Sequence, residues 1–153
     1  MVKISFAGAL TQPLQSEMTL CSEGEDIYFN CSLKDGKIVS ICAKGNVSPN
    51  RGYVRYKYGI ENDIIEYPKK NLPPGDNFIL SDVSEGAIHG LHLKFSVNKY
   101  IYVISSVWPA GLYVSRNNKI IFDKECKASR YKSFSNKIFD GINQAAPSRV
   151  DIH

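Results

Sequence analysis

The sequence lacks the long apolar runs and the compact motifs that would assign it to most large protein classes. No stretch approaches the ~20 consecutive apolar residues that a membrane-spanning helix requires. There is no P-loop and no dinucleotide-binding glycine pattern, and no G-x-S-x-G segment surrounds Ser105 or Ser106. Internal repeats and low-complexity tracts are also absent. These absences disfavour membrane-spanning, nucleotide-dependent and repeat proteins.

Residues that could bind a metal ion are few and unsuitably spaced. No two cysteines form a C-x-x-C pair, and Cys21, Cys31 and Cys42 lie too far apart in the sequence for a zinc knuckle. His89 and His92 are separated by an odd number of positions, so on a strand they would point to opposite faces. We therefore expect no metal site and no cofactor, and we assign no catalytic residue.

Size and charge limit the class further. The chain has 153 residues, of which 43% are hydrophobic, which suits one domain with an ordinary core. Lys and Arg total 19 against 15 Asp and Glu, for a net charge of +4. This mildly basic balance favours acidic partners, but nucleic-acid-binding modules usually concentrate charge more strongly than the nearest cluster, Arg51, Arg55 and Lys57. We expect no nucleic-acid partner.

The four cysteines are the most informative residues present. An even count in a small β-rich chain indicates two disulfides and an oxidising compartment. The alternative is that all four are reduced and buried as small hydrophobic residues. Residues 1–10 are too short and too broken in hydropathy for a signal peptide, so export from the cytosol implies a signal already removed.

Three cysteines bracket a predicted hairpin. Residues 27–33 alternate in hydropathy, the segment 34–37 carries a turn signal at Asp35-Gly36, and residues 38–43 form the return strand. A two-residue loop at 36–37 would set Cys31 directly opposite Cys42, whereas a loop at 35–36 would set the two cysteines diagonally. In either register both cysteines lie on the same face of the hairpin. We favour Cys31–Cys42 with Cys21–Cys126, and Cys21–Cys31 with Cys42–Cys126 stays open.

The rest of the chain also reads as short strands separated by turns. Further strands are predicted over 53–58, 64–67, 77–80, 92–97, 100–105, 112–116 and 119–122. A short helix is expected between residues 133 and 142, behind a serine cap. The predicted fold is all-β and mainly antiparallel, a single-domain sandwich or small barrel-like sheet with that C-terminal helix. We divide the chain into an N-terminal extension (1–20), one β-rich domain (21–144) and a flexible tail (145–153).

Aromatic residues supply the candidate binding surface. The chain has nine tyrosines, and most lie on predicted strands, where tyrosine is also common for purely structural reasons. A tyrosine offers a large ring with a polar tip, which suits recognition surfaces. Trp108 lies in a loop beside a proline and is the strongest single anchor candidate. We predict that a partner binds to Tyr56, Lys57, Tyr58 and Trp108.

Several segments resemble a family of small exported, disulfide-containing β-proteins of Gram-negative bacteria. The likeness begins with Cys21, the I-Y-F-N-C run ending at Cys31, and the G-K-I-V-S-I-C-A run containing Cys42. It continues through G-Y-V-R-Y-K-Y-G at 52–59, where Lys57 replaces an expected arginine, and E-Y-P at 66–68. It also includes residues 90–95, Y-I-Y-V at 100–103 and Cys126, so it covers roughly residues 20 to 127. The resemblance implies location better than activity.

The resemblance and the absent catalytic motifs lead to one principal functional hypothesis. Small periplasmic β-proteins with disulfides are often inhibitors, and some are similar to lysozyme inhibitors or to immunity proteins against type VI secretion toxins. We therefore expect a non-enzymatic periplasmic protein that occludes the active site of a secreted peptidoglycan-degrading toxin.

Two alternatives remain from other functional classes. One is a small glycan hydrolase that uses two carboxylates about 5–9.5 Å apart, drawn from Asp26, Glu66, Asp76, Asp82 and Glu85. The other is a binding module for an acidic surface polymer, which would use Arg51, Arg55 and Lys57.

Overall fold

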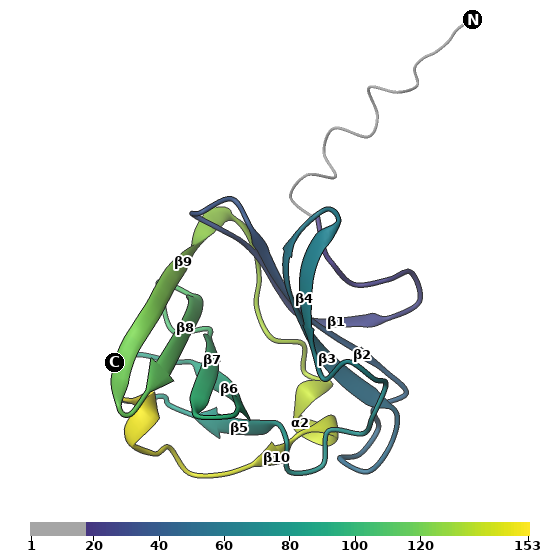
Figure 1. Cartoon of the computed structure of the whole chain (residues 1–153). Helices are drawn as coiled ribbons and strands as arrows, with labels where there is room; N and C mark the ends of the chain where they lie inside the picture. Colours follow the sequence, from purple (N-terminus) through teal and green to yellow (C-terminus); the bar gives the residue numbers. More distant parts are fainter. Residues whose placement is uncertain (1–17) are drawn as a thin grey trace, which may run out of the picture.

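The computed structural model describes residues 18–153, and within them ten strands form one sheet (Figure 1). The elements are β1 Asp26–Leu33, β2 Ile38–Lys44, β3 Tyr53–Ile60, β4 Asp63–Tyr67, β5 Ile79–Asp82, β6 Leu91–Val97, β7 Tyr100–Ser105, β8 Gly111–Arg116, β9 Lys119–Lys132, α2 Ile138–Gly141, β10 Asn143–Gln144 and the 3₁₀ turn η2 Arg149–Asp151. The strand order is β10-β5-β6-β7-β8-β9-β1-β2-β3-β4. Every pairing is antiparallel except that of β10 with β5. The predicted all-β, mainly antiparallel fold is confirmed.

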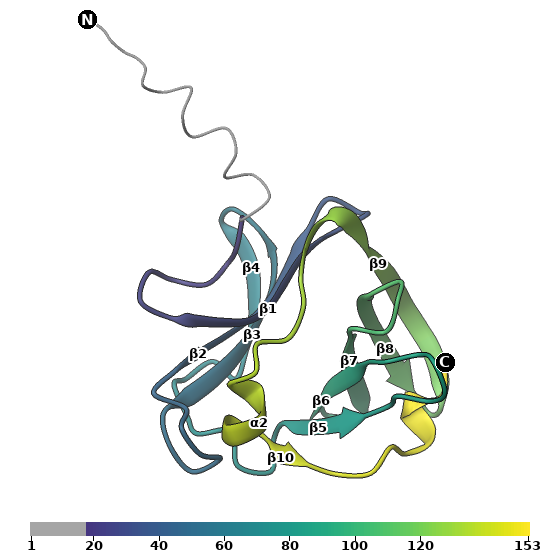
Figure 2. The same cartoon turned by 180° about the vertical axis from the view of Figure 1, so that it is seen from behind.

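The long strand β9 joins the two halves of the sheet. Its first part pairs with β8, up to the pair Gly111 and Glu125, and its last part pairs with β1, from Leu33 opposite Cys126 onwards. The sheet folds over at this strand, so that β3 and β4 face β6 and β7 (Figures 1 and 2). The ends of the sheet, β4 and β10, do not pair, so the barrel-like sheet is not closed.

An aromatic stack holds the two halves together. Phe95 on β6 lies parallel to Tyr67 on one side and to Tyr102 on the other, with ring centroids 4.9 Å and 4.8 Å away. Tyr56 on β3 completes the contact across the interior, 4.8 Å from Phe95. Tyr56 and Phe95 belong to the buried core, and the partly buried Tyr67 and Tyr102 pack against it, so the cluster buries a large apolar surface between the two halves.

The pairing of β1 with β2 differs from both predicted registers. The loop between the two strands spans residues 34–37, and Cys31 lies opposite Val39. This pairing is one residue away from the nearer predicted register, and a shift of one residue turns a side chain to the other face of the sheet. Cys42, which lies opposite Ile27 beyond a bulge, consequently does not share a face with Cys31.

All four cysteines are paired, as Cys21–Cys42 and Cys31–Cys126, with Cα–Cα distances of 5.4 Å and 5.6 Å. The favoured pairing, Cys31–Cys42 with Cys21–Cys126, is therefore wrong, and so is its alternative, Cys21–Cys31 with Cys42–Cys126. Cys31 faces the interior, where β9 brings Cys126 beside it, whereas Cys42 meets the segment around Cys21 on the other face. Two disulfides indicate an oxidising environment, outside the cell or in the periplasm.

The C-terminal segment is more ordered than its polar sequence predicts. The expected helix over 133–142 is one turn, α2, and no side chain caps it. Residues 145–153, expected to be a flexible tail, lie against the sheet: Ala145 N donates to Leu80 O, and η2 places Asp151 beside β6. Of the expected N-terminal extension, residues 1–17 lie outside the described part. Among residues 18–153, no helix has the length and hydropathy needed to cross a membrane.

Candidate functional site

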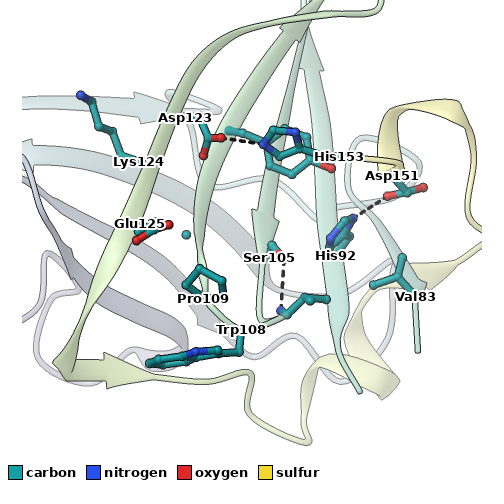
Figure 3. A pocket seen from close by; sticks show the side chains of 13 residues that line it. Val83, His92, Ser105, Trp108, Pro109, Asp123, Lys124, Glu125, Asp151 and His153 are labelled. Atoms are coloured by element: carbon teal, nitrogen blue, oxygen red, sulfur yellow. Dashed lines mark hydrogen bonds and ion pairs between the residues drawn. The ribbon is translucent and has the colours of Figure 1, made fainter. Parts of the chain in front are cut away.

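A pocket of about 390 Å³ lies between β6, β7, β8, β9 and the C-terminal segment (Figure 3). Its lining combines aromatic, acidic and basic side chains with one serine. The residues used in the argument below are His92, Ser105, Trp108, Tyr113, Asp123, Glu125, Asp151 and His153. Ordered polar groups that converge in one cavity are typical of a binding or catalytic site.

Trp108 stands at the rim of this pocket on a well-fastened loop. The residue is 70% exposed, the highest value among the described phenylalanine, tyrosine and tryptophan residues. Before it, Val107 N donates to Ser105 Oγ at 3.1 Å. After it, Ala110 is buried and its carbonyl accepts from Cys126 N at 2.8 Å. The loop is therefore fixed on both sides of Trp108, while the large apolar ring itself stays exposed to solvent.

A buried charge network forms one wall of the pocket. Asp151, whose side chain is 1% exposed, accepts from Lys94 Nζ and from Ser148 N, both at 2.7 Å, and lies 2.8 Å from His92 Nδ1. Burial acts to raise the pKa of the Asp151 carboxyl, but the hydrogen bond from Lys94, with those from Ser148 and His92, holds it below its usual range. Burial also lowers the pKa of the His92 imidazole, against the opposing effect of Asp151.

The protonation states in this network follow from the donors and acceptors. An ionised carboxylate can only accept, so His92 Nδ1 carries the proton that it shares with Asp151. The other ring nitrogen, Nε2, is then an acceptor in the neutral imidazole. The network thus fixes both the orientation and the tautomer of His92.

The opposite wall contains two further ion pairs that are more exposed. Asp123 Oδ2 lies 2.6 Å from His153 Nε2, and Glu125 Oε1 accepts from Lys34 Nζ at 2.6 Å. Tyr113 lies between the two histidines, with its hydroxyl donating to Val150 O at 2.8 Å, and burial raises its pKa. The C-terminal segment is therefore fastened to the sheet at several points around the pocket.

The structure places the four predicted binding residues in different environments. Tyr56 is 3% and Lys57 8% exposed, so the structure buries both residues and neither offers a surface to a partner in this conformation. Tyr56 is part of the aromatic core, where burial raises its pKa, and Lys57 Nζ reaches Leu20 O at 3.4 Å. Tyr58 is half-buried and donates to Asp35 at 3.1 Å, and burial, with Asp35, raises its pKa to about 12. Of the four, Trp108 alone lines the pocket described above.

The basic cluster expected for an acidic polymer is largely engaged within the protein. Arg55 donates to Pro68 O at 3.0 Å and to Asn71 Oδ1 at 3.3 Å, and it forms an ion pair with Glu66. Lys57 is buried, as noted, and Arg51 is exposed. These contacts leave little of the expected positive surface.

The carboxylates considered for glycan cleavage do not meet in the pocket either. None of Asp26, Glu66, Asp76, Asp82 and Glu85 lines it. Asp26 pairs with Lys137 at 3.0 Å, and hydrogen bonds from Ser84 lower the pKa of Asp82. The acidic groups that do line the pocket are Asp123, Glu125 and Asp151, which the sequence did not single out.

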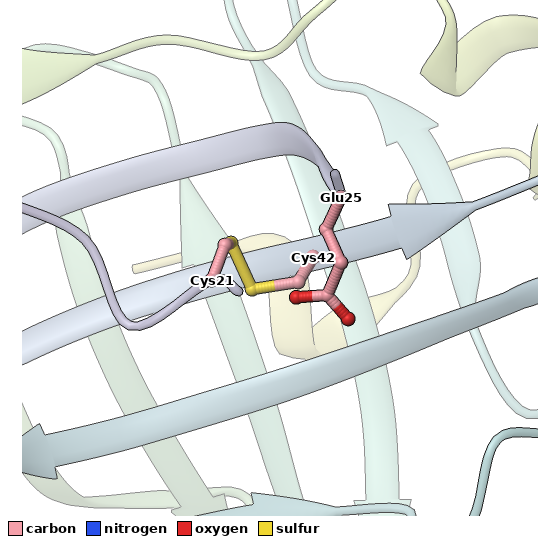
Figure 4. Close-up of side chains that lie close together, drawn as sticks. All are labelled: Cys21, Glu25 and Cys42. Carbon is pink, nitrogen blue, oxygen red and sulfur yellow. A yellow bond between two sulfur atoms is a disulfide. The ribbon is translucent and has the colours of Figure 1, made fainter. Parts of the chain in front are cut away.

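One group of candidate metal ligands, Cys21, Glu25 and Cys42, lies on the outer face of β2 (Figure 4). Both sulfurs belong to a disulfide, so neither is the thiolate that a metal ion requires. Glu25 already accepts from Ser22 N at 2.7 Å and from Tyr53 OH at 2.6 Å. This group fits a structural role.

No protein-family model matches the chain, and neither the curated proteins nor the solved structures contain a significant match to it.

Proposed function

We propose that this protein is a periplasmic binding protein, an inhibitor or immunity protein that occludes the active site of a peptidoglycan-degrading enzyme. The observation that carries the proposal is the exposed Trp108 ring on a loop fastened at both ends. Alanine-scanning studies of protein interfaces find tryptophan among the residues that contribute most to affinity.

The scaffold supports this role because it reduces the cost of binding. Association loses free energy when loops and side chains become ordered, so a surface that is already fixed retains more affinity. The Cys31–Cys126 bridge joins β1 to β9, and Cys126 N also holds the loop through Ala110 O. The same residue, Cys126, thus forms both the disulfide and the hydrogen bond that fastens the Trp108 loop.

The surroundings of Trp108 carry both signs of charge. Asp123, Lys124 and Glu125 follow one another on β9 along the same pocket. Charged groups around an apolar anchor select the orientation of a partner and increase the rate of encounter. This arrangement fits a protein partner better than a uniformly acidic polymer, whose expected ligands Arg55 and Lys57 are engaged internally.

The proposal is tested by capturing a cell-wall hydrolase from periplasmic and secreted extracts of toxin-producing strains. We expect the wild-type protein to retain the hydrolase and to inhibit its action on purified peptidoglycan, and Trp108→Ala to lose at least tenfold in affinity. Phe139→Ala is the matched control, because Phe139 is a 44% exposed aromatic residue outside the pocket lining. Equal inhibition by wild type and Trp108→Ala would contradict the proposed anchor, and no captured hydrolase would contradict the proposed role.

A further inference from the structure

The pocket contains a serine, a histidine and an aspartate in the order that activates a nucleophile. Asp151 holds His92 through Nδ1, at 2.8 Å, and His92 lies directly opposite Ser105 in the β6–β7 pairing. Residues opposite each other in an antiparallel pair share a face, with Cβ atoms about 4.5–5.5 Å apart. In Figure 3, His92 lies between Ser105 and Asp151, and all three side chains line the cavity.

The hydrogen-bonding capacities of Ser105 and His92 are complementary. Ser105 Oγ accepts from Val107 N at 3.1 Å, which leaves its own proton to be donated elsewhere. His92 uses Nδ1 as a donor to Asp151, which leaves Nε2 as an acceptor. Among the described residues no hydrogen bond joins the two side chains, but such catalytic bonds are often long before a substrate binds.

We propose that Ser105 is a nucleophile that accepts acyl groups from small esters, with His92 as its general base and Asp151 as the residue that positions His92. In this step Ser105 Oγ forms a bond to the carbonyl carbon while the ester C–O bond breaks. The hydroxyl proton passes to His92 Nε2 and then to the departing alkoxide, which leaves as an alcohol. This chemistry is independent of the proposed binding of a hydrolase through Trp108.

The environment favours the base form of the histidine and access for a small acyl donor. Burial holds the imidazole neutral near pH 7, which is the form that can take a proton. The pocket of about 390 Å³ is large enough for a small ester but not for a polymer within it.

The experiment uses the full chain and an alkyl fluorophosphonate as the probe. Attack of Ser105 Oγ on phosphorus displaces fluoride, the proton leaves through His92, and the stable adduct is located by peptide mass spectrometry. We expect one adduct, on Ser105, that forms in the folded protein and not in urea. Ser106→Ala is the matched control, because this neighbouring serine is bonded to Leu91 through its hydroxyl and does not line the pocket.

Two variants separate a reactive serine from an ordinary one. Ser105→Ala should abolish labelling, and His92→Gln should slow it about 100-fold or more, the usual contribution of a general base. In the wild type, the labelling rate should fall as the pH drops through the pKa of His92, whereas in His92→Gln it should lose this dependence. Circular dichroism of each variant serves as the control that it is folded. Labelling elsewhere, no labelling of Ser105, or a rate unaffected by His92→Gln would overturn the proposal.

Discussion

Replacing Asp151 by Asn should destabilise the protein substantially, although the residue is the third from last in the sequence. The substitution keeps the side chain's shape and removes its charge. It leaves the ammonium of Lys94, a side chain only 10% exposed, without its counter-ion at 2.7 Å. Removing one partner of a buried ion pair costs about 3–5 kcal/mol, because the remaining charge is uncompensated.

Urea unfolding followed by circular dichroism measures this effect. With a slope of about 1–3 kcal/mol per M of urea, the midpoint should fall by at least about 1 M. The exposed Asp63 provides the control, because Asp63→Asn should change the midpoint very little. Combining Asp151→Asn with Lys94→Met should recover much of the loss, since no unpaired charge then remains. A midpoint for Asp151→Asn within 0.2 M of wild type, a threshold of roughly 0.5 kcal/mol, would refute the reasoning.

Three further predictions concern titration, the disulfides and the tryptophan. Burial lowers the pKa of His92 in the folded protein below the value of about 6.5 expected in the unfolded chain. The stability that the neutral imidazole contributes is therefore complete above about pH 6.5 and is lost as the pH falls towards the folded pKa. His92→Gln should remove this pH-dependent loss from urea midpoints measured between pH 7 and 5. The Cys31–Cys126 bridge closes a span of 95 residues, so replacing both cysteines by serine should cost about 4–5 kcal/mol in thermal or urea unfolding, and a loss below about 1 kcal/mol would contradict the loop-closure account. Trp108, the single tryptophan, should show solvent-exposed fluorescence that iodide quenches strongly, and protection from iodide in the free protein would argue against its exposure.

Most of the strands were predictable because they are joined by local turns. The β6–β7 hairpin follows from alternation on either side of Asn98-Lys99, and the same register places His92 opposite Ser105. Asn117 and Asn118, the two residues between the predicted strands 112–116 and 119–122, adopt positive φ values of 52° and 63°, which a tight hairpin turn of type I′ requires. The geometry of such a turn is determined by a few adjacent residues.

Features that depend on distant partners were not predictable. The second part of β9 is polar, and it is a strand because it pairs with β1, about a hundred residues earlier in the chain. The disulfide pairing was missed because one additional register shift changes which face a cysteine occupies. Asp151 was assigned to a flexible tail because the segment after Gln144 is largely polar and contains a proline. Its role depends on Lys94 and His92, which no local pattern connects to it.

The shared strand β9 has a consequence for how the protein can be divided. Since β9 supplies an edge to both halves and its Cys126 is cross-linked to β1, a fragment that ends before β9 would expose the edges of both β8 and β1 and would leave Cys31 without its disulfide partner. Neither half therefore meets the conditions for folding by itself, and the whole sheet should melt as one cooperative unit.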